Sequence, residues 1–336
     1  MRFQTVYTEI TNRCNLNCAT CYNRSGRNLE TKEISVEQIE HILQFCSGYG
    51  AKRFLFSGGE PSLHTHFHGI LQLLDKYPQF EYGFVTNGTI HDEIWIDFLN
   101  THANMTVQVS LDGPTEQSNR LTRGANHFDR AVGFVRKLHL IARKPLLKMV
   151  VSQNNISDVE AFYRFAVSLN CVPEFAYIYK SGNGSENWES KALSPQQKLS
   201  VLRTVKALNE EYGLEAYLPM CTVRCPYTSG TEHMSICIKT SGAIQPCQTL
   251  YSDEYSIGNV FDFQRQAALA RMDALVALAQ SRLGQDYGCQ KCLLREGCGK
   301  GCLAAAVNNF GDPLAADGDC QFRKLQFIDM HVSKAH

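Results

Sequence analysis

The cysteines constrain this chain more than any other feature of its sequence. The chain has 336 residues and 14 cysteines, and most of the cysteines fall into two groups. The first group comprises Cys14, Cys18 and Cys21, and the second runs from Cys221 to Cys320. A chain of this size does not need disulfides to stabilise its core, and the compartment predicted below is a reducing one. The grouping therefore predicts metal or cluster binding.

Charge and hydropathy limit the partners. The chain has 33 basic and 33 acidic residues, a formal net charge of zero and a sequence pI near 7.1. A neutral chain lacks the electrostatic attraction that gathers nucleic acid or an anionic membrane, so we expect neither partner. The first residues mix charged and apolar side chains, so they predict no signal peptide and no membrane span. The expected location is cytoplasmic.

Alternating strand-like and helix-like segments predict an α/β fold. Expected strands cover 4–10, 53–56, 82–86, 106–110, 146–151 and 174–179, and expected helices cover 66–77, 92–100, 128–142 and 158–169. Ser35 with Gln38, and Ser194 with Pro195 and Gln197, have the pattern of helix-starting capping boxes. Six such units predict an open partial (β/α)6 TIM-like barrel rather than a closed one.

The rest of the chain predicts a second, smaller unit. Residues 181–190 are rich in Gly, Ser and Asn and are expected to form a loop, and we place the domain boundary near residue 215. The predicted domains are therefore residues 1–215 and residues 216–336. The second domain is rich in cysteine and includes one long helix, expected over 263–283.

The loop after the first strand has three cysteines, Cys14, Cys18 and Cys21, followed by Tyr22. Three thiolates on a four-iron, four-sulfur cluster leave one iron without a protein ligand, and that iron is an open site. The alternative is a zinc site with a fourth ligand from His64, His66 or His68. The spacing alone does not decide between them.

The ends of the next three strands favour the cluster. They read Ser57-Gly58-Gly59-Glu60-Pro61, Thr86-Asn87-Gly88 and Ser110-Leu111-Asp112-Gly113. In a parallel sheet or barrel the carboxyl ends of the strands share one face, and that face forms the active site. Glycines allow a close backbone approach to a ligand, and Glu60 provides a carboxylate suited to an ammonium group.

Together, these motifs resemble the radical S-adenosylmethionine (radical SAM) superfamily. The resemblance implies that Cys14, Cys18 and Cys21 ligate a 4Fe-4S cluster whose open iron binds S-adenosylmethionine (SAM). It also implies cofactor contacts from seven residues: Tyr22, Gly58, Gly59, Glu60, Asn87, Ser110 and Arg123. Of these, Glu60 would hold the ammonium group, the Tyr22 backbone would meet the adenine, and Ser110 would contact the carboxylate. Arg123 departs from the family pattern by about one position, and Ser118-Asn119 replaces the usual His-Asp pair before it.

The C-terminal cysteines resemble the SPASM domain, which binds two auxiliary iron–sulfur clusters. The resemblance implies one cluster on Cys289, Cys292, Cys298 and Cys320. It implies a second on Cys302, Cys247, Cys225 and Cys221, which gives three 4Fe-4S clusters in all. A zinc ribbon is the alternative for this region. The remaining cysteines, Cys46, Cys171 and Cys237, have apolar or strand-like surroundings and are expected in the core.

The resemblance implies an enzyme that reductively cleaves SAM to a deoxyadenosyl radical, which then abstracts hydrogen from a substrate. The leading hypothesis is a ribosomally synthesised peptide that becomes crosslinked, thioether-bridged or epimerised. An external electron donor such as flavodoxin or ferredoxin is expected. Because Cys14 comes so early, no N-terminal recognition domain is expected, and a separate peptide-recognition protein could supply that role.

Three alternatives stay open at this point. One is a radical epimerase or dehydrogenase acting on a small molecule such as a sugar or an antibiotic precursor. Another is an anaerobic sulfatase-maturase-like enzyme, although Gln248 stands where those enzymes have an acidic residue, and an amide cannot accept a proton at neutral pH. The third is a non-catalytic iron–sulfur electron-transfer or sensor protein, against which the complete set of cysteines with Glu60 and Ser110 argues.

Overall fold

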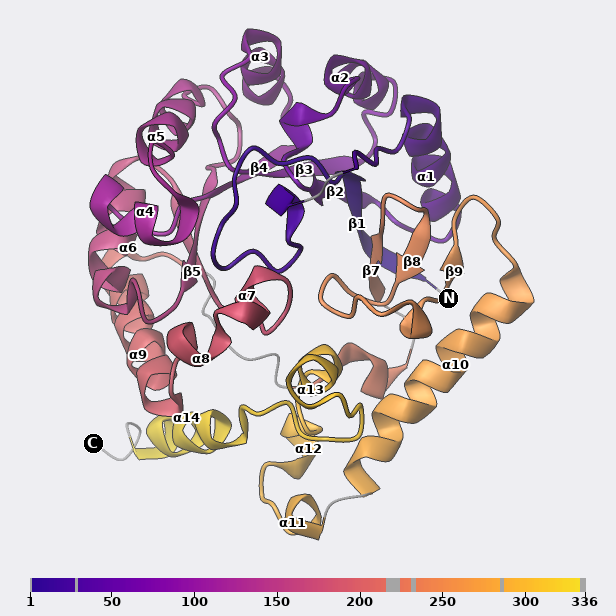
Figure 1. Ribbon diagram of the computed structural model, residues 1–336, viewed down its shortest axis with the longest axis vertical. Helices are drawn as coiled ribbons and strands as arrows, with labels where there is room; N and C mark the ends of the chain where they lie inside the picture. Colours follow the sequence, from indigo (N-terminus) through magenta and orange to yellow (C-terminus); the bar gives the residue numbers. More distant parts are fainter. Residues whose placement is uncertain (1, 28–29, 216–223, 231–233, 285–286, 333–336) are drawn as a thin grey trace.

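The computed structural model describes residues 2–27, 30–215, 224–230, 234–284 and 287–332, and within them one curved sheet organises the chain (Figure 1). The strands are β1 Phe3–Thr11, β2 Arg53–Gly58, β3 Glu81–Thr86, β4 Met105–Ser110, β5 Leu146–Val151, β6 Val172–Tyr177, β7 Met234–Ile238, β8 Ala243–Gln245 and β9 Gly258–Asn259. Their order in the sheet is β6-β5-β4-β3-β2-β1-β7-β8-β9. The sheet is open, with β6 and β9 at its edges, as the prediction of a partial barrel requires.

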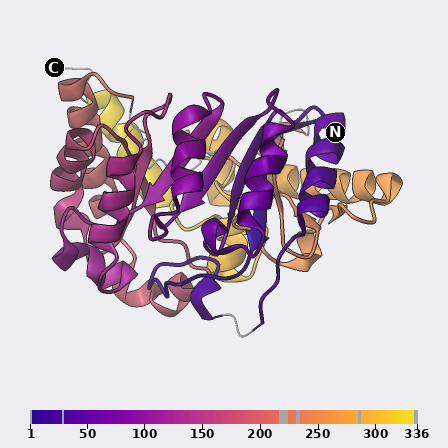
Figure 2. The same cartoon turned by 90° about the horizontal axis from the view of Figure 1, so that it is seen from above.

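The first six strands are parallel to their neighbours, and helices cover their outer side (Figures 1 and 2). These helices are α1 Val36–Gly48, α2 Phe67–Asp75, α3 Glu93–Thr101, α4 Glu116–Arg123, α5 Phe128–Lys137, α6 Val159–Ser168 and α9 Pro195–Tyr212. The two predicted capping boxes are present, at Ser35 for α1 and at Ser194 for α9. Each satisfies otherwise unpaired amide groups in the first turn and so fixes where the helix begins.

Alternation along the strands separates the core from the interior of the barrel. In β2, Phe54 and Phe56 are buried in the hydrophobic core, where the Phe56 ring packs at a tilt against Phe84 with ring centroids 5.3 Å apart. Leu55 and Ser57, which point to the other side, line a cavity. The predicted core thiols Cys46, Cys171 and Cys237 are all buried, and burial raises their pKa values.

Two expectations about helices were wrong. Residues 181–190 do not form a plain loop: they contain α7 Asn183–Glu186 and most of α8 Trp188–Lys191. The helix expected over 128–142 ends at Lys137. The side chain of Asn100 donates to the Lys137 carbonyl at 2.9 Å and accepts from the Leu140 amide at 3.2 Å, which turns the chain away from the helix axis.

The C-terminal region extends the same sheet. Strand β7 pairs in parallel with β1, and β8 and β9 follow in antiparallel order. The helices of this region are α10 Arg265–Ser281, α11 Tyr287–Gln290, α12 Arg295–Cys298, α13 Leu303–Phe310 and α14 Cys320–Val332. Short 3-10 helices lie at Ser25–Arg27, Pro61–Leu63, Ile156–Asp158, Pro226–Ser229, Asp253–Tyr255 and Arg282–Gly284. The proposed domain boundary near residue 215 adjoins a segment outside the described residues.

Helix α14 returns to the barrel and packs on α9 (Figure 1). Its Phe322 ring lies against Tyr177 at the end of β6, with ring centroids 6.1 Å apart. Two ion pairs join the helices and their flanks: Lys198 with Asp319 at 2.5 Å, and Arg203 with Asp329 at 2.6 Å. No helix in the described ranges has the length and apolar character needed to span a membrane.

Candidate active site

A cavity of about 620 Å³ lies inside the curve of the sheet, and every residue predicted to bind the first cluster or SAM lines it. These residues are Cys14, Cys18, Cys21, Tyr22, Gly58, Gly59, Glu60, Asn87, Ser110 and Arg123. Side chains from the C-terminal region line the same cavity, among them Gln248, Cys302 and Asn308. The cavity therefore connects the two groups of cysteines.

The loop with the three cysteines is held by helix α7, which the sequence did not single out. The Asn183 side chain donates to the Cys18 carbonyl at 2.8 Å and to Asn17 Oδ1 at 3.0 Å, and its backbone amide donates to the Cys21 carbonyl at 2.8 Å. Gly182 has a φ of +57°, and a Cβ there would lie 2.5 Å from the carbonyl oxygens of Cys21 and Tyr22. Glycine is needed because neither this backbone conformation nor this close contact admits a side chain.

The strand end with two glycines packs on the start of the same loop. A Cβ on Gly59 would lie 1.9 Å from the Arg13 carbonyl oxygen, and one on Gly58, whose φ is +122°, would lie 2.1 Å from that of Thr11. The Glu60 amide donates to the Arg13 carbonyl at 2.7 Å. The glycines thus permit a close backbone approach, as predicted, but the approach seen is to the cysteine loop.

Glu60 is 1% exposed, and its carboxylate accepts several hydrogen bonds. One oxygen accepts from Ser62 Oγ at 2.6 Å and Thr86 Oγ1 at 2.7 Å, and the other accepts from the Asn87 amide at 2.6 Å. Burial raises the pKa of Glu60, and these hydrogen bonds oppose that shift. The carboxylate is therefore fixed in orientation at the wall of the cavity.

Arg123 lies between a buried carboxylate and a cysteine. Its Nε is 2.9 Å from Asp112 Oδ2, and its Nη1 is 3.9 Å from Cys18 Sγ. Asp112 is fully buried and also accepts from Thr122 Oγ1 at 2.9 Å and the Val150 amide at 2.8 Å. Burial acts to lower the pKa of Arg123, but Asp112 and Cys18 raise it overall. The sequence did not single out Asp112 as a residue of the site. Its position just after the carboxyl end of β4 is the signal that could have identified it.

Two thiols of the loop, those of Cys14 and Cys18, need a partner to ionise. Burial raises the pKa of Cys14 to about 12 and that of Cys18 to about 11. Bound iron supplies that partner because cluster ligands are thiolates. Three thiols lining one cavity match the donor set expected for a 4Fe-4S cluster with one open iron, so these residues fit that group.

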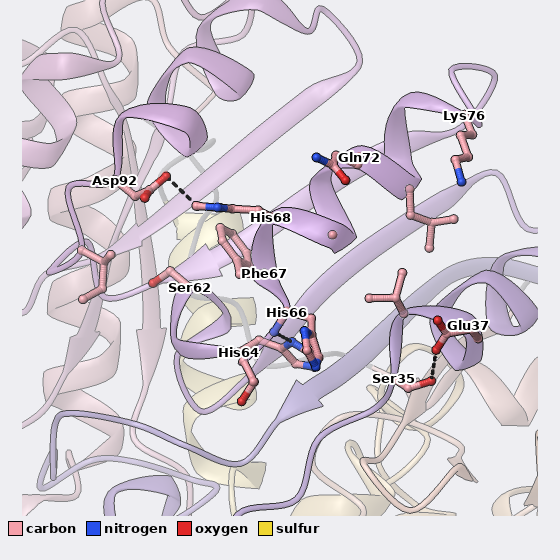
Figure 3. A pocket seen from close by; sticks show the side chains of 15 residues that line it. Ser35, Glu37, Ser62, His64, His66, Phe67, His68, Gln72, Lys76 and Asp92 are labelled. Carbon is pink, nitrogen blue, oxygen red and sulfur yellow. Dashed lines mark hydrogen bonds and ion pairs between the residues drawn. The ribbon is translucent and has the colours of Figure 1, made fainter.

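The histidines of the zinc alternative lie elsewhere. His64, His66 and His68 line a separate pocket of about 720 Å³ beside α1 and α2, whose other walls include Ser35 and Asp92 (Figure 3). His64 uses both ring nitrogens, one with the Ile34 carbonyl at 2.9 Å and one with the His66 amide at 3.0 Å, and His68 pairs with Asp92 at 3.0 Å. None of the three lines the cavity of the cysteines.

The structure brings three of the predicted auxiliary ligands together. Burial raises the pKa of Cys225 and, to about 12, that of Cys302, and the nearby Cys247 adds to both shifts; Cys225 adds to that of Cys302 as well. A β-bridge between Arg224 and Gly301 aligns the segments of Cys225 and Cys302. Cys221 lies outside the described residues.

The other predicted auxiliary set falls in one short stretch and on α14. The Cys292 amide donates to the Cys289 carbonyl at 3.1 Å, Cys298 ends α12, and Cys320 begins α14. Arg323, one turn into α14, donates to Cys298 Sγ at 3.6 Å. This contact connects α14 with the Cys298 segment.

Comparisons with known proteins agree with this geometry. Residues 8–166 match the model of the radical SAM superfamily. The mycofactocin maturase MftC of Mycobacterium ulcerans (strain Agy99) is 26% identical over 323 residues, which cover 88% of this chain and 82% of that protein. The cysteine-type anaerobic sulfatase-maturating enzyme of Clostridium perfringens (strain 13 / Type A) is 24% identical over 353 residues, or 94% of this chain and 92% of that enzyme. The crystal structure of Streptococcus suis SuiB bound to precursor peptide SuiA has the same fold, with a TM-score of 0.75, 18% identity, and coverage of 95% of this chain and 76% of that one.

The partial barrel, the cavity lined by three cysteines and the match over residues 8–166 define a radical SAM enzyme. It uses SAM and a 4Fe-4S cluster. The cysteine-rich C-terminal region makes it a member of the SPASM type within that superfamily.

Proposed function

We propose that this enzyme modifies a ribosomally synthesised peptide, forming a crosslink or thioether or inverting a stereocentre. One observation carries the proposal: a single cavity extends from Cys14, Cys18 and Cys21 to Gln248 and Cys302 of the C-terminal region. A peptide segment in this cavity would lie between the SAM-binding cluster and the auxiliary clusters. Relatives of this chain are described as a peptide-binding SuiB and as maturases, which supports the substrate class.

When bound, SAM and its cluster supply a deoxyadenosyl radical that abstracts hydrogen from the substrate. The residues of the chain would hold and orient SAM. Glu60, fixed by its hydrogen bonds from Ser62, Thr86 and Asn87, would accept the ammonium group of SAM. Ser110, at the end of β4, would donate to the carboxylate, and the Tyr22 backbone would meet the adenine.

In this scheme Arg123 acts on SAM mainly through its positive charge rather than through a direct contact. Its ion pair with Asp112 orients the guanidinium, and the side chain is 10% exposed. It would therefore face the cofactor carboxylate from within the cavity while stabilising the thiolate of Cys18.

The two auxiliary clusters belong to the proposal. Cys289, Cys292, Cys298 and Cys320 would ligate one, and Cys302, Cys247, Cys225 and Cys221 the other. They would accept the electron released when the substrate radical forms a bond, or position the substrate. An external donor such as flavodoxin or ferredoxin would reduce the first cluster, and a separate protein could present the peptide.

A sulfatase-maturase activity is less well supported. Gln248 lines the cavity in place of the acidic residue of those enzymes. An amide cannot take up the proton released on substrate oxidation at neutral pH. Gln248 in place of an acidic residue therefore counts against the sulfatase-maturase reaction.

The test is mass spectrometry of candidate peptides encoded beside this gene, incubated with reduced enzyme and SAM. Loss of a hydrogen pair indicates crosslinking, and unchanged mass with deuterium uptake from solvent indicates epimerisation. If SAM is cleaved but every peptide stays unmodified, the substrate is a small molecule and the peptide proposal is wrong. Absence of deoxyadenosine with the first cluster intact would instead indicate a non-catalytic iron–sulfur protein.

A further inference from the structure

The segment between Cys298 and Cys302 has an unusual backbone. Gly299, Lys300 and Gly301 have φ values of +54°, +60° and +75° in succession. Two glycines adopt this conformation freely, but Lys300 pays for it, so the surroundings must hold the turn in place. The segment lies between a predicted ligand of each auxiliary cluster.

Arg282 holds this turn from the inside. It is fully buried, and its guanidinium donates to the Gly301 carbonyl at 2.9 Å, the Lys300 carbonyl at 3.1 Å and the Ala315 carbonyl at 2.9 Å. The Lys300 ammonium, 5% exposed, donates to the Leu314 carbonyl at 2.9 Å. Neither cation is paired with a carboxylate by these contacts.

Arg323 and Asp317 connect the two predicted cluster sites. Arg323 contacts Cys298 Sγ at 3.6 Å through Nη1 and forms an ion pair with Asp317 through Nη2. Asp317 in turn accepts from the Cys302 amide at 2.9 Å. One buried ion pair thus touches a ligand of each cluster.

In the part of this region that the structure describes, buried cations outnumber buried carboxylates. Arg282, Lys300 and Arg323, which we call the cationic cradle, are all at most 5% exposed. Among the described residues from 224 to 332, Asp317 is the one buried carboxylate. Burial of a cation without an anion is costly, and burial lowers the pKa of Arg282 while Cys225, Asp317 and Cys302 raise it. A cluster ligated by four thiolates is an anion of the kind this region requires.

We propose that Arg323, the member of the cationic cradle in contact with Cys298, sets the reduction potential of the auxiliary cluster on Cys289, Cys292, Cys298 and Cys320, while Arg282 and Lys300 hold the turn between the two predicted sites. This inference rests on the auxiliary clusters of the proposed function. A positive charge and an N–H···S hydrogen bond both favour the more negative, reduced form of a cluster. Arg323 is therefore a positioning and tuning residue that raises the potential.

The test is a redox titration of the reconstituted full-length enzyme followed by electron paramagnetic resonance. The signal that changes on addition of SAM belongs to the first cluster, and the signal lost in Cys298→Ala belongs to the cluster in question. In Arg323→Met, the ratio of reduced to oxidised cluster at the wild-type midpoint should fall about tenfold, which is ~59 mV for a one-electron couple. Arg323→Lys keeps the charge and should stay closer to wild type.

A matched control separates charge from packing. Arg203 forms an ion pair with Asp329 of the same helix α14, at 2.6 Å, but its side chain is 62% exposed. Arg203→Met should leave the potential unchanged, and a shift equal to that of Arg323→Met would overturn the inference.

Each of the other possible outcomes also tests the role of Arg323. A fully assembled Arg323→Met enzyme with an unchanged potential refutes the inference alone. If that variant fails to assemble the cluster, Asp317→Asn decides: it removes the one buried carboxylate and should raise the potential, so an unchanged or lower value overturns the inference. About four iron atoms in the wild-type enzyme would refute the auxiliary clusters themselves, and this inference with them.

Discussion

Asn183→Ala tests whether helix α7 holds the cluster loop. The side-chain nitrogen of Asn183, Nδ2, donates two hydrogen bonds, to the Cys18 carbonyl at 2.8 Å and to Asn17 Oδ1 at 3.0 Å. Asn183 is 1% exposed. Alanine keeps the backbone hydrogen bond to the Cys21 carbonyl, so the substitution removes only the side-chain contacts.

The expected cost follows from the two hydrogen bonds that are lost. Each contributes about 1 kcal/mol, so the substitution should cost ~2 kcal/mol, although the Cys18 carbonyl keeps its hydrogen bond from the Cys21 amide at 3.2 Å. If this energy opposes local opening of the loop, the open population rises roughly 30-fold, because each 1.36 kcal/mol is a factor of ten. The amide of Ala19, which donates to the Thr122 carbonyl at 2.8 Å, should exchange faster by that factor.

Anaerobic hydrogen exchange measured by mass spectrometry checks this expectation on the reconstituted enzyme. Asn154→Ala is the matched control, because Asn154 also donates from its side chain to a backbone carbonyl, that of Leu121 at 3.3 Å, but in an exposed position. The control should leave exchange in the cysteine loop unchanged. Equal exchange in Asn183→Ala and wild type would refute the view that α7 holds the loop.

Three further predictions concern the clusters and the buried charges. Reconstituted enzyme should contain about 12 iron atoms, and Cys18→Ala should lose roughly four of them and form no deoxyadenosine; an iron content near four with stoichiometric zinc would contradict the auxiliary clusters. Burial raises the pKa of Glu9 to about 7 in the folded protein, although Lys239 acts in the opposite direction. Ionising this buried carboxyl opposes folding, so the stability of the protein falls as the pH rises towards about 7. In urea unfolding, the free energy of unfolding of Glu9→Gln minus that of wild type should therefore increase by about 2.5 kcal/mol between about pH 5 and about pH 8. A difference that does not change with pH would refute the raised pKa of Glu9. Asp112→Asn leaves Arg123 without its buried partner and should cost about 3 kcal/mol in the same assay, whereas a loss below about 1 kcal/mol would count against the ion pair.

Much of the fold could be predicted because its signals are local. Capping boxes at Ser35 and Ser194 fix two helix starts, and alternating apolar residues mark the strands. The errors arose where tertiary contacts decide. Asn183 and Asn187 form short helices because their amides bind the cysteine loop, 165 and more residues earlier in the chain. No local pattern encodes such a contact.

The candidate site divides in the same way. The spacing of Cys14, Cys18 and Cys21 predicted a shared metal or cluster site, because three thiols lie within eight residues, but it left a cluster and a zinc site open. The sequence also placed Glu60, Asn87 and Ser110 on one face, since the carboxyl ends of parallel strands meet. Periodicity therefore predicted the barrel, and the resemblance of these motifs to the radical SAM superfamily supplied the cofactor class.

Only the tertiary structure decided how the two groups of cysteines relate to each other. It placed Cys302 in the wall of the cavity that Cys14, Cys18 and Cys21 also line, and it joined β7 to β1 in one sheet. It also buried Arg282, Lys300 and Arg323 in a region where Asp317, paired with Arg323, is the one buried carboxylate among the described residues. The physical reason is that charge compensation and cavity walls depend on distances between residues far apart in the chain, whereas spacing and periodicity depend only on neighbours.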